Sequence, residues 1–571
     1  MAKKVLIVGG VAGGASAAAR LRRLDEEAQI ILFERGEYIS FANCGLPYYL
    51  SGIIAERESL LVQTVQGMTE RFNIDIRVNS EVTKIDREKK VVEVFSQGGS
   101  YKESYDYLIL SPGAEPLRPP IPGIDRDKVF TLRNMSDVDQ IKAYLLAEKP
   151  QKTAVIGGGY IGIEMAENLS HAGLEVTLVE AAEHILAPFD REMARMIEKV
   201  LLDHGLQLIV NDKVQKISHR YEADNRKVIE LQSGSTIEVD CIIVAAGIKP
   251  DSRLAKEAGL SLGQGDAIAV DAFLQTSDPF IYAIGDAIEV QDFVSGTRGI
   301  MPLAGPANKQ GRIAADNICG RKRIYEGTQG TSIIKVFDYT AAATGNNERK
   351  LRQEGIPYIK SYTQSNSHAE YYPNATTLTI KLLFTPDDGK ILGAQIVGKE
   401  GVDKRIDVLA TAIRQGLNVY DLEELELAYA PPYSSAKDPV NMAGFVATNI
   451  LRRDVKIKHW EELSQLQQEE ITLLDVRTNL EYRQGHIEGA LHIPVDRLRK
   501  SFTKIPKNRK VIVYCKAGLR AYLACRILEH HGYEAYNLSG GYDIYLADRH
   551  LFNQGMNMNE QMTEFEDVSN D

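Results

Sequence analysis

Short apolar runs alternate with helix-forming segments along the first half of the chain. The run Lys3–Val8 leads through glycines into the alanine-rich segment Ala15–Leu24, and a second apolar run follows at Ile30–Phe33. The same order recurs from the run Thr153–Ile156, through a helical segment, to Glu175–Val179. Apolar runs of this length that flank a helical segment are typical of buried parallel strands joined by crossover helices. The pattern therefore predicts two βαβ units.

A glycine-rich turn joins the first strand to the helix in each unit, and an acidic residue ends each second strand. The turns are Gly9-Gly10-Val11-Ala12-Gly13-Gly14 and Gly157-Gly158-Gly159-Tyr160-Ile161-Gly162, and the acids are Glu34 and Glu180. In such a turn glycine lets the backbone approach a pyrophosphate, and an acid about 20 residues later binds ribose hydroxyls. The sequence therefore predicts two dinucleotide sites.

The two turns are not identical. Val11 takes the place of the second glycine in the first turn, and we expect Gly13 and Gly14 to compensate for it. In the second unit, Glu180 is followed by two alanines rather than by arginine. Because an arginine would accommodate the 2′-phosphate of NADPH, the second site is expected to prefer NADH.

The composition is that of a globular protein with several domains. The 571 residues exceed a typical single domain several times, and 44% of them are hydrophobic. The formal net charge of −11 argues against nucleic acid as a main partner. No apolar run approaches the roughly 20 residues that span a bilayer, so we expect no membrane association. The five cysteines include no CxxC pair, which favours a cytoplasmic location and argues against a metal site.

Further motifs resemble a known family. Ala283-Ile284-Gly285-Asp286 puts an aspartate directly after a strand and a glycine, and it follows Ser111-Pro112-Gly113-Ala114 and Ala245-Ala246-Gly247. In this order, across residues 1–448, the chain resembles the pyridine nucleotide-disulfide oxidoreductases, in which the aspartate binds the ribityl chain of FAD. The resemblance implies FAD and NADH as cofactors. It implies cofactor contacts at Gly9, Gly14, Glu34, Arg35, Ser111, Gly113, Asp286, Gly157, Gly159, Tyr160, Ile161, Gly162, Glu164, Glu180 and Gly247.

Cys44 is the first candidate for catalysis. Pro47 suits the first turn of a following helix, and a thiolate at a helix N-terminus is stabilised. A small buried thiol is the alternative. Related disulfide reductases have a second cysteine five residues on, where this chain has Tyr49. Cys44 must therefore alternate between a thiolate and either a sulfenic acid or a mixed disulfide with an external thiol.

The residues around Cys44 resemble the single-cysteine branch of the family, which holds the coenzyme A-disulfide reductases and the NADH oxidases and peroxidases. The glycine turn resembles the former more closely, which implies coenzyme A as the thiol. The implied substrate contacts are Ser16, Arg20, Arg23, Ser40, Asn43 and Lys437. Arg20 and Arg23 also share one helix face, where they could hold the coenzyme A phosphates, although Arg22 and Arg23 could instead form a solvated helix end.

Tyr371 and Tyr429 match active-site positions of the same family. A phenol can donate a proton to a departing thiolate and stays neutral at physiological pH. The neighbouring Tyr372 and Tyr433 could serve equally. The resemblance implies a homodimer, in which these tyrosines would reach Cys44 of the partner subunit.

Cys515 is the second candidate for catalysis. A predicted strand, Val511–Tyr514, feeds a loop that runs from Cys515 to Arg520, and a helix follows at Ala521–Leu528. Loop N–H groups and a helix N-terminus lower a thiol pKa and stabilise an anionic sulfur adduct. The CxxxxR spacing is one residue shorter than the phosphatase signature, which favours persulfide chemistry. Cys525, inside the helix, is expected to lie in the core.

The motifs that surround Cys515 resemble the rhodanese domain. They are Leu474-Asp475-Val476-Arg477, Gly485-His486-Ile487-Glu488-Gly489-Ala490 and Leu538-Ser539-Gly540-Gly541-Tyr542. The resemblance implies that Cys515 carries sulfane sulfur, with Arg520 in the same loop. An inactive copy kept for binding is the alternative, but such copies usually lack the cysteine.

The expected fold is α/β: two Rossmann-like nucleotide-binding domains plus an α+β dimerisation domain, followed by a C-terminal α/β rhodanese domain. The expected boundaries are 1–115 and 247–322 for the FAD-binding domain, 116–246 for the NAD-binding domain, 323–448 for the dimerisation domain, 449–468 for a charged helical linker, 469–553 for the rhodanese domain and 554–571 for an acidic tail.

The expected function is NADH-dependent reduction of coenzyme A persulfide, coenzyme A disulfide or polysulfide through Cys44, with Cys515 as sulfur carrier. An NADH oxidase or peroxidase that cycles Cys44 through sulfenic acid is one alternative. A sulfur-relay module that delivers persulfide to a protein partner is another.

Overall fold

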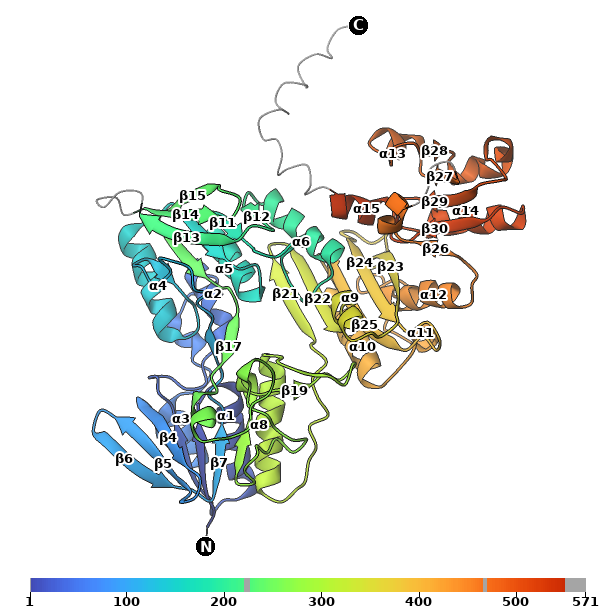
Figure 1. Cartoon of the computed structure of the whole chain (residues 1–571). Coiled ribbons are helices and arrows are strands. Elements are labelled where there is room, and N and C mark those ends of the chain that lie inside the picture. Colours follow the sequence, from blue (N-terminus) through green and yellow to red (C-terminus); the bar gives the residue numbers. More distant parts are fainter. Residues whose placement is uncertain (1, 220–225, 466–469, 550–571) are drawn as a thin grey trace. The chain divides into compact units, whose positions relative to one another are not determined.

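The computed structural model describes residues 2–219, 226–465 and 470–549. The expected acidic tail, the last residues of the expected linker (466–468) and the end of the expected rhodanese domain (550–553) lie outside the described residues. The chain forms two compact units, Met1–Ile185 with His204–Gly330 and Leu186–Asp203 with Thr331–Asp571 (Figure 1). In the part of the chain described, no helix is long and apolar enough to cross a membrane.

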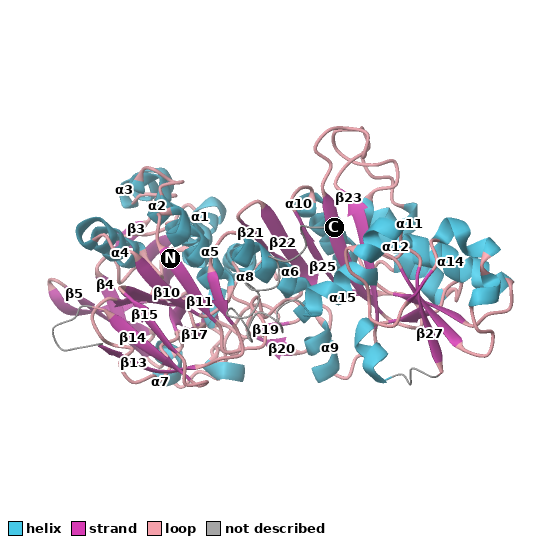
Figure 2. Ribbon diagram, turned by 90° about the horizontal axis from the view of Figure 1, so that it is seen from above, coloured by secondary structure: helices cyan, strands magenta, loops and turns pink. Residues whose placement is uncertain are grey.

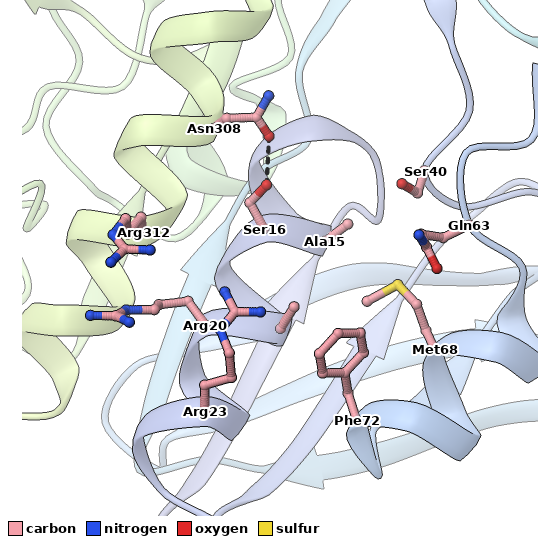
Figure 3. A pocket seen from close by; sticks show the side chains of 11 residues that line it. Ala15, Ser16, Arg20, Arg23, Ser40, Gln63, Met68, Phe72, Asn308 and Arg312 are labelled. Atoms are coloured by element: carbon pink, nitrogen blue, oxygen red, sulfur yellow. Dashed lines mark hydrogen bonds between the residues drawn. The ribbon is translucent and has the colours of Figure 1, made fainter.

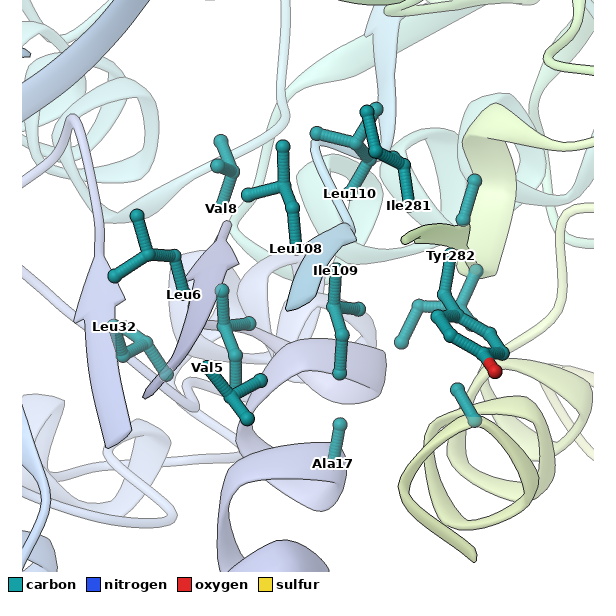
Figure 4. Packing of buried hydrophobic residues seen from close by; sticks show 14 of the residues in the cluster. Val5, Leu6, Val8, Ala17, Leu32, Leu108, Ile109, Leu110, Ile281 and Tyr282 are labelled. Carbon is teal, nitrogen blue, oxygen red and sulfur yellow. The ribbon is translucent and has the colours of Figure 1, made fainter. Parts of the chain in front are cut away.

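The first unit contains a parallel five-stranded sheet formed near the N-terminus, with the strand order β18-β7-β1-β2-β3. Its strands are β1 (Lys4–Val8), β2 (Gln29–Phe33), β3 (Asp75–Arg77), β7 (Tyr107–Leu110) and β18 (Ile281–Ala283). Apolar side chains of these strands pack into one buried cluster (Figure 4). Strands β1, β2, β7 and β18 are apolar at nearly every position because both of their faces are buried, whereas the edge strand β3 is charged at both ends and is not buried.

A second parallel sheet in this unit has the order β12-β11-β10-β16-β9. Its strands are β9 (Val129–Phe130), β10 (Lys152–Ile156), β11 (Glu175–Val179), β12 (Gln207–Ile209) and β16 (Cys241–Val244). In each sheet the first strand of the βαβ unit has two neighbours that both come later in the chain. These neighbours are β2 and β7 for β1, and β11 and β16 for β10, so the strand order reverses at β1 and at β10. Such a reversal opens a crevice at the carboxyl ends of the strands, where nucleotides bind.

Helices and small antiparallel sheets complete the first unit. The helices are α1 (Ala12–Leu24), α2 (Leu46–Ser51), α3 (Val65–Phe72), α4 (Met135–Glu148), α5 (Tyr160–His171), α7 (Arg253–Glu257) and α8 (Ala304–Ile318). The remaining strands are β4 (Ser80–Asp86), β5 (Val91–Ser96), β6 (Gly99–Ser104), β8 (Ala114–Pro116), β13 (Val214–His219), β14 (Lys227–Leu231), β15 (Thr236–Val239), β17 (Ile248–Pro250), β19 (Val290–Gln291) and β20 (Arg298–Gly299).

The second unit begins with an antiparallel sheet of order β21-β22-β25-β24-β23. Its strands are β21 (Ser332–Val336), β22 (Tyr339–Gly345), β23 (Ile359–Asn366), β24 (Thr377–Phe384) and β25 (Ile391–Gly398). Helices α10 and α12 pack against it (Figure 2). The helices of this part are α6 (Arg191–Asp203), α9 (Glu348–Gln353), α10 (Val402–Arg414), α11 (Val419–Glu424) and α12 (Pro439–Leu451).

A parallel sheet of order β26-β30-β29-β27-β28 follows in the same unit. Its strands are β26 (Ile457–Lys458), β27 (Ile471–Asp475), β28 (Leu491–His492), β29 (Lys510–Tyr514) and β30 (Ala535–Leu538), and its helices are α13 (Asn479–Arg483), α14 (Leu519–His530) and α15 (Gly541–Arg549). The expected succession of two parallel α/β sheets, an α+β region and a C-terminal parallel sheet is therefore confirmed.

The connector after α12 differs from the helix that its charged sequence suggests. It contains strand β26, which pairs with β30, and a 3-10 helix at Trp460–Gln465. A strand of two residues is too short to show a period of two in the sequence, so the pattern could not reveal it.

Candidate functional site

The first glycine turn brings the start of α1 against the end of β7. Gly9 has φ +97°, and a Cβ there would lie 2.0 Å from the carbonyl oxygen of Ser111. A Cβ at Gly14 would lie 1.8 Å from the carbonyl oxygen of Gly9. No side chain fits at either position, so the turn requires glycine.

The second turn repeats this geometry. A Cβ at Gly157, with φ +111°, would lie 2.3 Å from the carbonyl oxygen of Ala245, and one at Gly162 would lie 1.8 Å from that of Gly157. Gly14 therefore corresponds to Gly162, and Val11 takes the place of Gly159 as the N-cap residue of its helix. The departure at Val11 leaves the two close-packing glycines of the turn unchanged.

Each acidic residue lies beside its glycine turn. The Glu34 carboxylate accepts hydrogen bonds from the N–H groups of Gly10 and Gly36, both at 2.9 Å. The Glu180 carboxylate accepts from Gly158 at 2.6 Å and Ala182 at 2.7 Å. Neither α1 nor α5 has a side-chain N-cap, so their first N–H groups can donate to a pyrophosphate. These turns therefore fit two dinucleotides.

The other predicted cofactor residues lie at the same crevices. Asp286 follows β18 directly in a 3-10 turn, where burial raises its pKa although the nearby Arg133 opposes this shift. Gly113 and Gly247 both have positive φ angles, +76° and +114°. Tyr160 and Ile161 open α5, with Glu164 one turn further on. Arg35 is held by ion pairs with Glu115 and Asp251.

Cys44 lies in a 3-10 turn, Asn43–Gly45, that runs into α2, and its side chain reaches solvent. Desolvation by the surrounding protein raises its pKa, and the carboxylates of Glu164 and Asp286 add to this effect. The expected stabilisation of the thiolate is thus outweighed, because burial and two nearby acidic side chains both disfavour the charged form.

Tyr48 is a site residue that the sequence reasoning missed. It stands four residues after Cys44, on the same side of the helical segment, and it hydrogen-bonds Glu164. Burial raises the pKa of Glu164 to about 7, and Glu167 contributes in the same direction. The hydrogen bond from Ser51 to Asn168, at 2.6 Å, joins α2 to α5 beside this pair. The spacing from Cys44 is the signal that would have found Tyr48.

Four of the six predicted substrate residues line one cavity of about 320 Å³ (Figure 3). They are Ser16, Arg20, Arg23 and Ser40. The cavity also has lining residues that the sequence did not predict: Gln63, Met68, Phe72, Asn308 and Arg312. Its volume is typical of small-molecule sites. No local sequence signal marks Arg312, because α8 lies far along the chain from α1.

The arginines of this cavity are not equivalent. Arg20 forms a 2.7 Å ion pair with the buried Asp316, which also pairs with Arg323 at 3.2 Å, so the charge of Arg20 is partly balanced within the protein. Within the described residues, neither Arg23 nor Arg312 pairs with a carboxylate, and both side chains are exposed. The cavity therefore offers two uncompensated cations to an anionic ligand.

Arg22 does not belong to a solvated end of α1, which was the alternative considered for Arg22 and Arg23. It is buried and donates to the carbonyl oxygens of Phe72 at 2.9 Å and Asn73 at 2.8 Å. It is thus a structural residue that satisfies the end of α3, whereas Arg23 faces the cavity.

The remaining predicted substrate residues do not line this cavity. Asn43 is exposed beside Cys44, and Lys437 is exposed in the second unit.

In the second unit, the four candidate tyrosines differ in the contacts that their side chains make. The hydroxyl oxygens of Tyr371 and Tyr429 lie 2.9 Å apart, and both side chains are exposed. Tyr372 instead packs edge-on against His368. The pair that the sequence favoured is therefore the pair that the structure brings together.

Cys515 lies at the carboxyl end of β29 and is buried. Its Sγ accepts a hydrogen bond from the N–H of Gly518 at 3.1 Å. Arg520 interacts with Cys515 and holds Glu481 through two hydrogen bonds of 2.6 and 2.7 Å, which lower the pKa of Glu481 to about 2. Cys525 lies in the core, as predicted.

Family comparisons agree with this arrangement. Residues 3–311 match the family model described as pyridine nucleotide-disulphide oxidoreductase, and residues 331–439 match the dimerisation domain of the same family. Residues 459–548 match a rhodanese-like domain. The first family implies FAD and NADH or NADPH as redox groups.

Several known proteins are similar to most of the chain. A coenzyme A disulfide reductase from Staphylococcus epidermidis is 36% identical over 447 residues, which are 78% of this chain and 99% of that protein. The structure of reduced CoADR-RHD from Bacillus anthracis has a TM-score of 0.93 and 52% identity, and the match covers 96% of this chain and 98% of that one. A NAD-dependent persulfide reductase from A. fulgidus has a TM-score of 0.89 and 38% identity, with 95% and 100% covered. The chain therefore belongs to the pyridine nucleotide-disulphide oxidoreductase family and carries a rhodanese-like domain after the dimerisation domain of that family.

Proposed function

We propose that this protein is an FAD enzyme in which NADH reduces the sulfur–sulfur bond of coenzyme A persulfide, coenzyme A disulfide or polysulfide at Cys44, while Cys515 carries sulfane sulfur. The observation that carries the proposal is the cavity between α1 and α8, because it offers Arg23 and Arg312 to an anionic ligand and includes Ser40 from the Cys44 loop. The names of the relatives, a coenzyme A disulfide reductase and a persulfide reductase, support it.

The two glycine turns would hold the cofactors. FAD, when bound, supplies two-electron transfer between a nicotinamide and a thiol. Glu34 and Glu180 would accept ribose hydroxyls of the first and second dinucleotide. NADH is preferred because the Glu180 carboxylate is fixed by the N–H groups of Gly158 and Ala182 and would repel a 2′-phosphate.

The chemistry at Cys44 is a thiol exchange. The Cys44 thiolate attacks the coenzyme A sulfur of the persulfide, a mixed disulfide forms, and hydrosulfide leaves and takes up a proton. Two electrons from NADH then break the mixed disulfide, which restores the Cys44 thiolate and releases coenzyme A as a thiolate that also requires a proton. Overall, coenzyme A persulfide, NADH and a proton give coenzyme A, hydrogen sulfide and NAD⁺.

Tyr371 and Tyr429 supply the proton to the departing coenzyme A. The hydrogen bond with Tyr429 raises the pKa of Tyr371, so this phenol remains a neutral donor. In the proposed homodimer they act on Cys44 of the partner subunit, with Lys437 on the substrate. Asn43, beside Cys44, completes the proposed substrate contacts.

The rhodanese-like domain takes or delivers sulfane sulfur. Gly518 N–H and Arg520 both face Cys515, so an anionic sulfur adduct is stabilised there. Coenzyme A persulfide is the acceptor that links the two cysteines most simply. We also propose that the domains have the boundaries expected from the sequence. The proposed location of the enzyme is the cytoplasm.

The test compares acceptors under anaerobic conditions. NADH oxidation is followed with coenzyme A persulfide, coenzyme A disulfide, polysulfide and peroxide, and sulfide is assayed in parallel. We expect persulfide or polysulfide to react fastest and sulfide to appear. A faster reaction with peroxide would replace the proposal with sulfenic acid chemistry at Cys44.

A further inference from the structure

A turn at the start of α15 lies directly behind the Cys515 loop. The N–H groups of Tyr542 and Asp543 donate to the carbonyl oxygens of Cys515, at 2.9 Å, and Lys516, at 3.1 Å. A Cβ at Gly541, which has φ +62°, would lie 2.6 Å from the Cys515 oxygen. The backbone of the nucleophile loop is therefore held by this turn at contact distance.

The same turn contacts strand β23, which belongs to the dimerisation region. A Cβ at Gly540 would lie 3.2 Å from Cδ2 of Tyr362, and Gln364 hydrogen-bonds the side chain of Asp543. Lys360, on the same strand, pairs with Glu461. Because side chains alternate along a strand, Lys360, Tyr362 and Gln364 share one face, and that face contacts the rhodanese-like region.

Tyr362 is itself fixed by buried charges. Its hydroxyl donates to Glu192 at 2.8 Å, and its ring packs edge-on against His459. Glu192 pairs with Lys381, which is fully buried and also contacts Asp190 at 2.8 Å. Displacing Tyr362 would remove a hydrogen bond from the buried Glu192 carboxylate, which is costly, so Tyr362 is held firmly in place on β23.

We propose that strand β23 is a working part of the sulfur-transfer site, with Tyr362 and Gln364 as positioning residues that act on Cys515 through the Gly540–Asp543 turn. This inference rests on the proposed sulfur transfer at Cys515. The dimerisation region thus sets the direction of the loop N–H groups that stabilise the sulfur transferred to Cys515. Neither residue touches the substrate.

The experiment exchanges the partners of one hydrogen bond in the full-length, FAD-loaded protein. Gln364→Glu places two acids together, whereas Gln364→Glu combined with Asp543→Asn restores an amide–carboxylate pair. We expect the single variant to lower kcat for sulfur transfer from thiosulfate to cyanide by about tenfold or more, with KM nearly unchanged, because a misplacement of about 1 Å at a site is costly. The double variant should recover most of this loss.

The matched control is Gln353→Glu, an exposed glutamine in the same region of the chain. The pH profile of Cys515 alkylation is measured for every variant, because positioning changes thiol reactivity whereas a purely structural contact changes only stability. Gln364→Ala removes the amide without adding charge and serves if the acidic variant does not fold. The inference would be overturned if the wild type transfers sulfur and the Gln364 variants have the same kcat and the same alkylation profile as the wild type. The proposed function would be overturned if the wild type itself transfers no sulfur.

Discussion

The hydroxyl groups of Tyr371 and Tyr429 share a 2.9 Å hydrogen bond although 58 residues separate them in the chain. Tyr371 is 75% exposed and Tyr429 is 48% exposed, so neither is held by a hydrophobic core. Exposed aromatic side chains that contact each other through their polar ends suit a site that is completed by another molecule. This contact distinguishes them from Tyr372 and Tyr433.

Loss of the Tyr429 hydroxyl is expected to impair the reductase. In Tyr429→Phe the hydrogen bond that raises the pKa of Tyr371 is gone, and one of two proton donors is lost. We expect kcat for NADH-linked reduction to fall about a hundredfold, in the usual range for a general acid. Steady-state kinetics with Tyr372→Phe as control test this, and equal losses in the two variants would contradict it.

The two cysteines are expected to act separately. Cys44→Ser should abolish NADH-linked reduction and leave sulfur transfer from thiosulfate intact, and Cys515→Ser should do the converse. Cys319→Ser is the control, because Cys319 belongs to neither site. Both activities are measured on each variant, and a parallel loss in either one would refute the division of labour.

Glu164 is expected to control the ionisation of Cys44. Its pKa of about 7 means that it gains a negative charge as the pH rises through neutrality, and this charge opposes formation of the Cys44 thiolate. In Glu164→Gln the charge is absent, so the pKa of Cys44 falls. The rate of Cys44 alkylation against pH should shift to lower pH, and an unshifted profile would rule the coupling out.

Arg312 is expected to select for coenzyme A. Arg312→Gln removes an uncompensated cation from the cavity, so KM for coenzyme A persulfide should rise by about tenfold, as for a lost charged hydrogen bond. KM for inorganic polysulfide should stay unchanged, because polysulfide has no nucleotide part. Lys309→Gln, on the same helix but outside the cavity, is the control, and a rise in KM for both substrates would argue against the assignment.

Arg520 is expected to need its guanidinium group. Arg520→Lys keeps the charge but loses the paired hydrogen bonds to Glu481, so the side chain is no longer held toward Cys515. Sulfur transfer should fall by about tenfold, with Arg483→Lys as an exposed control. Wild-type transfer in Arg520→Lys would mean that charge alone is sufficient.

The Arg520–Glu481 pair is expected to make the free energy of unfolding depend on pH in the acidic range. Arg520 lowers the pKa of Glu481 to about 2, below its ordinary value. The pair therefore stabilises the folded state above the ordinary carboxyl pKa, and this contribution is lost as the pH falls toward 2. Unfolding of Glu481→Gln should depend less on pH in this window than unfolding of the wild type.

The sequence was informative wherever a function depends on neighbours in the chain. The turns at Gly9 and Gly157, the acids Glu34 and Glu180, and the loop from Cys515 to Arg520 are each encoded within one supersecondary unit. Glycine is needed there because of a local close approach, so the residue type itself reveals the geometry.

Tertiary structure decided what depends on distant segments. Packing of α8 on α1 brought Arg312 into the cavity and let Asp316 pair with Arg20, which no local pattern could show. The raised pKa of Cys44 likewise reflects burial by the surrounding protein and, after it, the carboxylates of Glu164 and Asp286, which belong to other elements. Desolvation and Coulomb interactions depend on distance in space rather than along the chain, so the sequence determined which groups carry the chemistry and the fold determined their partners and charges.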